Sequence, residues 1–389
     1  MNDLFFSDEH LMLRDMVREF AANEVAPVAA ELDHEAIFPR EIIEKMAELG
    51  LMGIPIPEEY GGAGMDFVAY ITAVYELGKV CASTAITMAA HTSLGTTPIL
   101  LAGSEEQKQK YLPRLASGEM IGAFGLTEPE AGSDAGATKT TAVLDGDEWV
   151  INGSKIFTTN AGVAGLITIT AKAIIDGKEE GIGAFIIETE NPGLSVASLE
   201  KKMGWKASDT RQIFFENLRI PQENLLGSPA DGFKTFLKTL TGGRISVGAL
   251  SVGTAEGAYE AALKYSTERK AFGKPIHRFQ SVGFKLADMA TEIEASKLLV
   301  YNAAHKYNTG QDVAKEAAMA KLFASETAMR SATEAIQVFG GYGYIKEYPV
   351  ERYFRDAKAL TIGEGTSEIQ RIIISREITK GFLENLPES

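Results

Sequence analysis

The 389-residue sequence predicts an α+β chain with an N-terminal α-helical domain, a middle β-sandwich or barrel domain and a C-terminal four-helix bundle. Two changes of pattern define these parts. Apolar residues recur at helical spacing before residue 120 and again after Gly232. Between these regions, short alternating runs are separated by turn signals, as in all-β domains. We therefore place the domains at residues 1–120, 121–232 and 233–389.

The first domain contains signals for several helices. Ser7 is a suitable N-cap for a helix whose apolar face is formed by Leu13, Met16, Val17 and Phe20. Pro39 opens a second helix, and Gly50 ends it. A capping box that begins at Ser104 starts a third helix. We expect residues 58–64 to form a plain loop.

The middle domain is marked by two hairpin turn signals, Asp145-Gly146 and Asp176-Gly177. No segment of helical length intervenes, which disfavours a parallel sheet built from βαβ units. Strands are predicted around residues 149–151, 166–171, 183–187 and 211–215.

The C-terminal domain returns to the helical period. Its short links favour a bundle. Ser367 and Gln370 form a predicted capping box for the last helix. Long helices are predicted over residues 249–265, 284–307 and 314–339.

The composition of the chain argues against several classes of protein. The chain has 38 Lys and Arg against 53 Asp and Glu, a net charge of -15, which argues against a nucleic-acid-binding protein. The single cysteine, Cys81, excludes an intramolecular disulfide and fits a reducing compartment. Residues 1–5 do not begin a secretory leader, and no apolar run reaches the ~18 residues of a membrane span. We expect a cytoplasmic protein without a membrane span.

Common catalytic motifs are missing from the sequence. There is no Gly-x-Gly-x-x-Gly after a strand, no phosphate-binding P-loop, no His-Glu-x-x-His and no Gly-x-Ser-x-Gly. The five histidines lack metal-ligand spacing. These absences argue against a Rossmann nucleotide site, a metal centre and a serine hydrolase.

Four segments are richer in glycine and polar residues than packing requires: 125–134, 155–160, 337–344 and 362–370. The amides of the first could face an anion, but an interdomain linker has the same composition. The second is equally consistent with an ordinary strand. In the fourth, Glu364 lies between two glycines just before a predicted helix, so a substrate has room to approach it. An exposed glutamate near a helix N-terminus is the alternative.

Taken together, these segments resemble the acyl-CoA dehydrogenase family. Residues 125–137 match one family signature position by position. Residues 364–366 are similar to the Glu-Gly-Thr segment that carries the family's base, and residues 267–274 to a segment that reaches the FAD pyrophosphate across a subunit interface. The resemblance covers essentially the whole chain. A second signature is matched at Gln337, Gly340, Gly341, Gly343, Tyr344, Glu347, Arg352 and Asp356.

The resemblance implies FAD, bound between the β-domain and the helix bundle. The positions implied to line the isoalloxazine are Phe124, Leu126, Thr127, Gly132, Ser133, Phe157 and Thr159. Those implied to hold the pyrophosphate and adenosine, partly from a neighbouring subunit, are Arg269, Phe272, Gln280, Gln337, Gly340 and Gly341. The site would be closed by Thr366 and Glu368. The implied acyl-CoA contacts are Ser133, Thr241, Arg244 and Gly365.

The resemblance also implies a reaction. Glu364 would remove the α-proton of an acyl-CoA while the β-hydrogen leaves as hydride to flavin N5, giving a trans-2-enoyl-CoA. Burial should raise the pKa of this glutamate, which is otherwise a weak base. Gly363 stands where tyrosine is common in the straight-chain enzymes, which favours a branched or cyclic acyl group. The resemblance as a whole implies a short-chain or a branched or cyclic acyl substrate. Some members carry their base beside the position of Arg244, but here that residue is Gly243.

The implied partners are an electron-transfer flavoprotein and three further copies of the chain, in a homotetramer built as a dimer of dimers. Two other functions are considered. An acyl-CoA oxidase that uses O2 would carry an extra C-terminal domain beyond Ser389. A non-catalytic CoA-binding flavoprotein would have lost the base, and Glu364 is present.

Overall fold

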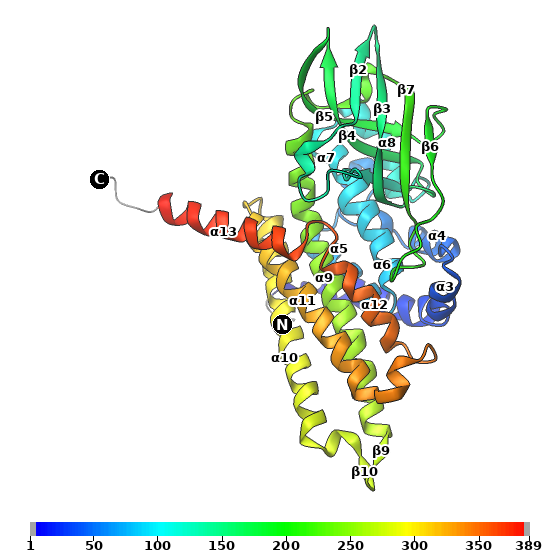
Figure 1. Cartoon of the computed structure of the whole chain (residues 1–389), viewed down its shortest axis with the longest axis vertical. Helices are drawn as coiled ribbons and strands as arrows, with labels where there is room; N and C mark the ends of the chain where they lie inside the picture. Colours follow the sequence, from blue (N-terminus) through cyan, green and yellow to red (C-terminus); the bar gives the residue numbers. More distant parts are fainter. Residues whose placement is uncertain (1–4, 385–389) are drawn as a thin grey trace.

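The computed structural model describes residues 5–384. Residues 1–4, which belong to the segment in which we expected no leader, and residues 385–389 lie outside the described part. Figure 1 shows the β-domain at one end of the long axis, with helices making up the rest. The longest helix, α9 (Gly232–Glu268), runs from the sheet to the opposite end and links the two regions. The predicted α, β, α order is confirmed.

The N-terminal part is helical, as predicted. Ser7 caps α2 and Ser104 caps α8, each through a capping box. Pro39 is the N-cap residue of α4. The expected loop at residues 58–64 contains a 3-10 turn, Glu58–Tyr60. The helices are α2 (Asp8–Phe20), α3 (Ala29–Glu35), α4 (Arg40–Glu48), α5 (Phe67–Gly78), α6 (Ala82–Ala89), α7 (Thr97–Ala102) and α8 (Glu105–Ala116), with a π-helical segment η4 (Ala90–Thr96).

Two of these helices, α5 and α6, were not predicted from the sequence, for a physical reason. Every residue of α5 and of α6 is buried, so neither helix has a solvent-exposed face. A helix that is apolar all round lacks the periodic contrast by which amphipathic helices are recognised. Both pack on α9 in the centre of the molecule.

The described part of the middle region forms one bent, mixed, eight-stranded sheet, ordered β6-β7-β3-β2-β4-β5-β8, with β1 also paired to β4. Both predicted hairpin turns are present. Two pairs, β1 with β4 and β2 with β4, are parallel without helical crossovers. The strands are β1 (Gly122–Gly125), β2 (Thr141–Asp145), β3 (Glu148–Thr159), β4 (Leu166–Ile175), β5 (Lys178–Glu188), β6 (Leu194–Val196), β7 (Thr210–Pro221) and β8 (Leu225–Leu226).

The C-terminal bundle is built on α9, which is far longer than the predicted segment 249–265. The predicted helix over 314–339 has the bounds observed for α11. The last helix, α13, projects from the body of the molecule (Figure 1). The remaining elements are the β9–β10 hairpin (Lys270–Ala271 and Lys274–Pro275), α10 (Gln280–Asn308), α11 (Ala314–Phe339), η8 (Gly340–Tyr344), α12 (Val350–Leu360) and α13 (Ser367–Glu384).

The predicted capping box at the start of α13 is wrong. The hydroxyl of Thr366, not that of Ser367, accepts a hydrogen bond from a first-turn amide, that of Ile369, at 3.3 Å. The Ser367 hydroxyl is buried without a partner. The side chain of Gln370 instead reaches back to carbonyls of the preceding turn. The cap falls one residue earlier because two left-handed residues precede it and set the direction of entry into the helix.

Candidate active site

Glu364 lies on a left-handed turn between α12 and α13. Its φ is 54°, and that of Gly365 is 96°. A non-glycine residue in this region is uncommon and needs support from its surroundings. Gln370 supplies part of it, because its Nε2 donates to the Gly365 carbonyl at 2.8 Å and to the Glu364 carbonyl at 3.3 Å.

The turn directs the carboxylate of Glu364 against α9 and η4. A Cβ added at Gly243 of α9 would overlap Oε2 of Glu364 and would also lie 3.0 Å from a methyl group of Leu94 in η4. Position 243 and position 364 therefore compete for the same space. Glycine at 243 is what allows a glutamate to enter from the α12–α13 turn.

The carboxylate is buried but not hydrogen-bonded. Both of its oxygens are shielded from solvent, and neither has a hydrogen-bond partner within the described chain. Burial raises the pKa of Glu364 to about 7, while Arg244 and Lys321 act in the opposite direction. A carboxylate that titrates near neutral pH and keeps its lone pairs free is suited to accept a proton.

Arg244 and Lys321 provide the positive charge around this carboxylate. Arg244 is 6% exposed and its Nε has no hydrogen-bond partner in the described chain. Lys321, on α11, is fully buried, and its Nζ donates to the Gly365 carbonyl at 2.9 Å. Burial lowers the pKa of each, and Glu364 partly offsets that effect.

Glu368 differs from Glu364 although it is only four residues away. It is exposed in the first turn of α13. Its own backbone amide and the Thr366 side chain lower its pKa, as expected for an acid at a helix N-terminus. Glu368 is therefore ionised at neutral pH and faces solvent, unlike the shielded Glu364 carboxylate.

The β-domain presents a second group of predicted site residues around Thr127. The carbonyl of Thr127 accepts from the amide of Ile156 at 2.8 Å, which joins the 125–134 segment to β3. The turn closes through two hydrogen bonds between Glu128 and Ala131. Gly132, which the family resemblance places against the isoalloxazine, lies just outside this turn and is exposed.

A buried ion pair holds this segment in place. Nζ of Lys155 donates to Oε1 of Glu128 at 2.7 Å and to the Leu126 carbonyl at 3.2 Å. The hydroxyl of Thr138 and the amide of Thr140 also donate to Glu128. Burial alone would raise the pKa of Glu128, but the bonds from Lys155 and Thr138 lower it to about 2.

Phe157 is exposed on a strained backbone. Its side chain is 64% exposed and its φ is 57°, at a register shift between β3 and β7. Two residues on, Thr159 ends β3 half-buried. A non-glycine residue with positive φ and an open aromatic face marks a surface that another flat group can cover.

A third group lies at the far end of the bundle. Arg269, Gly340 and Gly341 line a cavity of about 480 Å³ together with aromatic side chains. The guanidinium of Arg269 stands 5.5 Å from the ring centre of Tyr342. Phe272, at the tip of the β9–β10 hairpin, is 95% exposed with φ 51°.

The predicted site residues therefore form separate groups within one chain. One set lies where the α12–α13 turn meets α9 and consists of Glu364, Gly365, Thr366 and Arg244. Thr241 lies one helical turn before Arg244 on α9. A second set belongs to the β-domain and consists of Phe124, Leu126, Thr127, Ser133, Phe157 and Thr159. The third set lies at the other end of α9 and consists of Arg269, Phe272, Gln280, Gln337, Gly340 and Gly341. The 37 residues of α9 span about 55 Å. The two sets of positions are therefore separated along α9.

Three family models match this chain, those of the acyl-CoA dehydrogenase N-terminal, middle and C-terminal domains, over residues 7–119, 123–218 and 230–379. The chain belongs to the acyl-CoA dehydrogenase family. It is an oxidoreductase whose cofactor is FAD, and a solved family structure from Bacillus anthracis is described as complexed with FAD. The exposed ring of Phe157 and the open cavity beside Arg269 fit a bound flavin and its adenosine half.

Individual relatives are similar along their full length. The chain is 50% identical to "Acyl-CoA dehydrogenase, short-chain specific" of Clostridium acetobutylicum, over 97% of this chain and 99% of the relative. It is 49% identical to "Acyl-CoA dehydrogenase" of Bacillus subtilis, over 96% and 99%.

Solved structures agree with the fold. Butyryl-CoA dehydrogenase from Megasphaera elsdenii matches with a TM-score of 0.93 at 44% identity, over 96% of this chain and 99% of that one. A chain in the structure "Electron transferring flavoprotein of Acidaminococcus fermentans" matches with a TM-score of 0.94 at 49% identity, over 96% and 99%. Within residues 5–384, no helix is long and apolar enough to cross a membrane, and no cluster of metal-ligating side chains is present.

Three residues that support the site were not predicted from the sequence: Lys321, Lys155 and Trp205. Lys321 lies on the buried alanine stripe of α11, and a charge among Ala317, Ala324 and Ala328 at helical spacing is a usable signal. Lys155 gave no such signal, because register shifts on both sides of it interrupt the alternation of β3. Trp205, on the loop before β7, borders Gly363 of the base turn. Its backbone amide donates to Oδ1 of Asp356, 151 residues further along the chain, so no local signal could have identified it.

Proposed function

We propose that this protein oxidises a short-chain acyl-CoA thioester to the trans-2-enoyl-CoA, with Glu364 as the base that removes the α-proton. One observation carries the assignment. The Glu364 carboxylate is buried without a hydrogen-bond partner, and its pKa is raised to about 7. A base with a pKa near the working pH is efficient in proton transfer.

The residues around Glu364 support this role. An α-C–H beside a thioester is acidic only if the charge that develops on the carbonyl oxygen is stabilised. The backbone N–H of Glu364 makes no hydrogen bond to the described chain, so it can donate to that oxygen. Arg244 adds positive charge from α9. FAD, when bound, accepts the hydride from the β-carbon.

The proposed acyl group is short, straight or branched. The relatives named for short-chain and butyryl substrates support the length. Gly363, which precedes the base, leaves room beside the turn. The indole of Trp205 borders that room, with its ring 4.0 Å from the place where a Cβ at 363 would lie. This wall favours small branches over long chains.

We propose an electron-transfer flavoprotein as the electron acceptor and the cytoplasm as the location. The structural similarity to a chain of a structure described as an electron-transferring flavoprotein supports the acceptor. The single, buried Cys81 supports a reducing compartment. Rapid reoxidation of the reduced protein by O2 in place of a flavoprotein acceptor would favour the oxidase alternative.

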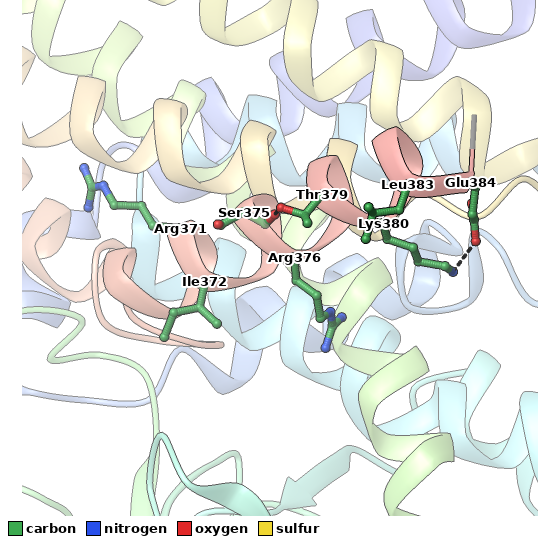
Figure 2. A pocket seen from close by; sticks show the side chains of 8 residues that line it. All are labelled: Arg371, Ile372, Ser375, Arg376, Thr379, Lys380, Leu383 and Glu384. Carbon is green, nitrogen blue, oxygen red and sulfur yellow. Dashed lines mark hydrogen bonds and ion pairs between the residues drawn. The ribbon is translucent and has the colours of Figure 1, made fainter. Parts of the chain in front are cut away.

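We propose a homotetramer, in which a neighbouring subunit completes each FAD site. The division of the cofactor residues between the two ends of α9 supports this. The projecting α13 supports it as well. Figure 2 shows Ile372, Arg376 and Leu383 along this helix, and Ile372 and Leu383 are 61% and 59% exposed. Light scattering that finds a monomer with full FAD content would contradict this assembly.

The experiment that tests the base compares Glu364→Gln with Glu368→Gln. Glutamine keeps the size of the side chain but cannot take the proton. Flavin reduction by butyryl-CoA, followed anaerobically by stopped flow, should slow by roughly 10²–10⁴-fold in Glu364→Gln, because general-base catalysis is worth about that factor. The Glu364→Gln protein should still contain FAD and bind the thioester.

Glu368→Gln is the matched control, because it makes the same chemical change four residues along on an exposed acid. It should reduce at near wild-type rate in the flavin-loaded fraction, with any loss in FAD retention. Near wild-type reduction by Glu364→Gln would overturn the assignment.

A further inference from the structure

Lys321 is a buried cation without a carboxylate in ion-pair contact in the described chain. It lies in the middle of α11, is fully buried, and makes one hydrogen bond, from Nζ to the Gly365 carbonyl at 2.9 Å. A lysine is almost never fully buried unless something compensates its charge. A backbone carbonyl compensates it only partly, so its position calls for a functional reason.

The carbonyl that Lys321 contacts belongs to the turn that carries the base. Glu364 and Gly365 are consecutive residues with positive φ, so the turn depends on outside support. The Gly365 carbonyl accepts from Lys321 on α11 and from Gln370 on α13. These two donors attach the turn to the elements on either side of it.

Lys321 also acts on the charge of Glu364. Three elements near this carboxylate carry ionisable groups that interact with it: Tyr70 on α5, Arg244 on α9 and Lys321 on α11. Burial raises the pKa of Tyr70 far above neutral, so it is uncharged. Glu368 and Arg376 act through Lys321 and Arg244, not directly on the base. Arg244 and Lys321 are therefore the two charges that oppose the burial of Glu364.

We propose that Lys321 is a positioning residue for the base: it holds the left-handed turn through the Gly365 carbonyl and supplies a positive charge that keeps Glu364 ionisable. This inference rests on the proposed role of Glu364. Lys321 does not itself reach the reacting atoms. Its contribution is the placement and the protonation state of the carboxylate.

The direction of the effect follows from the two pKa values. Burial lowers the pKa of Lys321 to about 8, with Glu364 partly offsetting it, and the pKa of Glu364 is about 7. Lys321 is thus mostly charged over the range in which Glu364 loses its proton. Removing this charge leaves burial less opposed, so the pKa of Glu364 should rise.

Three variants separate charge from structure. Lys321→Met removes the charge and the hydrogen bond but fills the same space on an apolar helix face, so the protein should fold. Lys321→Arg retains the charge. Lys315→Met makes the same change at an exposed position of α11, where the side chain is 42% exposed. Each is measured with full FAD loading by anaerobic flavin reduction with subsaturating butyryl-CoA between pH 5.5 and 9.5.

In Lys321→Met the ascending limb of the pH profile should move up by about one pH unit, the low end of what a nearby opposite charge does. Reduction should then be about tenfold slower than wild type at pH 6, with most of that deficit recovered above pH 9. Lys321→Arg should keep its midpoint near that of wild type, and Lys315→Met should be unchanged throughout.

A Lys321→Met profile lowered equally at all pH values, with an unmoved midpoint, would overturn the electrostatic role of Lys321. An unchanged profile would overturn the proposal altogether. Failure of the base assignment is distinguished by the Glu364→Gln variant. If Glu364→Gln reduces at wild-type rate, the proposed function fails. If it is slow while Lys321→Met is unshifted, only the proposed role of Lys321 fails.

Discussion

Two glutamates, Glu128 in the β-domain and Glu364 between α12 and α13, have shielded carboxylates in different surroundings. Glu128 receives hydrogen bonds from Lys155, Thr138 and two backbone amides, and its pKa falls to about 2. Glu364 receives none, and its pKa rises to about 7. Both face a buried lysine. The difference lies in whether that lysine bonds to the carboxylate or to the backbone beside it.

This contrast separates a structural acid from a reactive one. The Lys155–Glu128 pair fixes the 125–134 segment, because every donor is used and the carboxylate stays ionised. Lys321 bonds to the Gly365 carbonyl and leaves the lone pairs of Glu364 free. A reactive carboxylate needs nearby charge without hydrogen bonds that would lower its pKa and occupy its oxygens.

The largest expected change in stability comes from breaking the structural pair. Lys155→Met leaves the Glu128 carboxylate buried without its cation, which should cost about 3–5 kcal/mol of unfolding free energy. Urea unfolding of the FAD-loaded protein at pH 7 measures it. The matched control is Lys139→Met, which breaks the exposed pair with Glu130 in the same region and should change the unfolding free energy far less, because water already solvates both charges. Equal losses of unfolding free energy in the two variants would show that the buried pair stabilises the protein no more than the exposed pair does.

A smaller effect of opposite sign is expected at the reactive acid. The pKa of Glu364 is raised to about 7 from 4.5, so wild type loses stability as pH rises through this window, because the unfolded chain releases the proton first. Glu364→Gln has no proton to lose there. The variant should gain on the order of 3 kcal/mol relative to wild type between pH 4.5 and 8.

Thermal or urea unfolding of both proteins without substrate, across that pH range, measures the gain. A difference between variant and wild type that does not change with pH would mean that Glu364 is not buried as described. The same measurement on Glu368→Gln, whose pKa is lowered, should show no such gain.

The sequence predicted the domain order, the hairpin turns, the caps at Ser7 and Ser104, and the family. These features depend on local signals: turn dipeptides, capping side chains and long signatures. The error at Ser367 shows the limit of such signals. Thr366 and Ser367 are equally good caps by residue type, and the left-handed backbone of Glu364 and Gly365 decides between them.

The electrostatic parts of the site could not be predicted in this way. Lys155 meets Glu128 from 27 residues away, and Lys321 meets Gly365 from 44 residues away, each through packing between separate elements. Glycine at 243 makes room for Glu364 only because α9 passes behind the turn. Such contacts depend on how elements pack, and a single sequence carries no direct record of that.

The most direct test of Glu364 as the base is the pH dependence of flavin reduction in the wild-type protein. With subsaturating butyryl-CoA and no oxygen, the profile reports the free protein. The rate should rise about tenfold per pH unit below about pH 7 and then level off, as Glu364 ionises. A rate that is flat from pH 5.5 to 7 would contradict this role of Glu364, because the base would then be an ordinary, already ionised carboxylate.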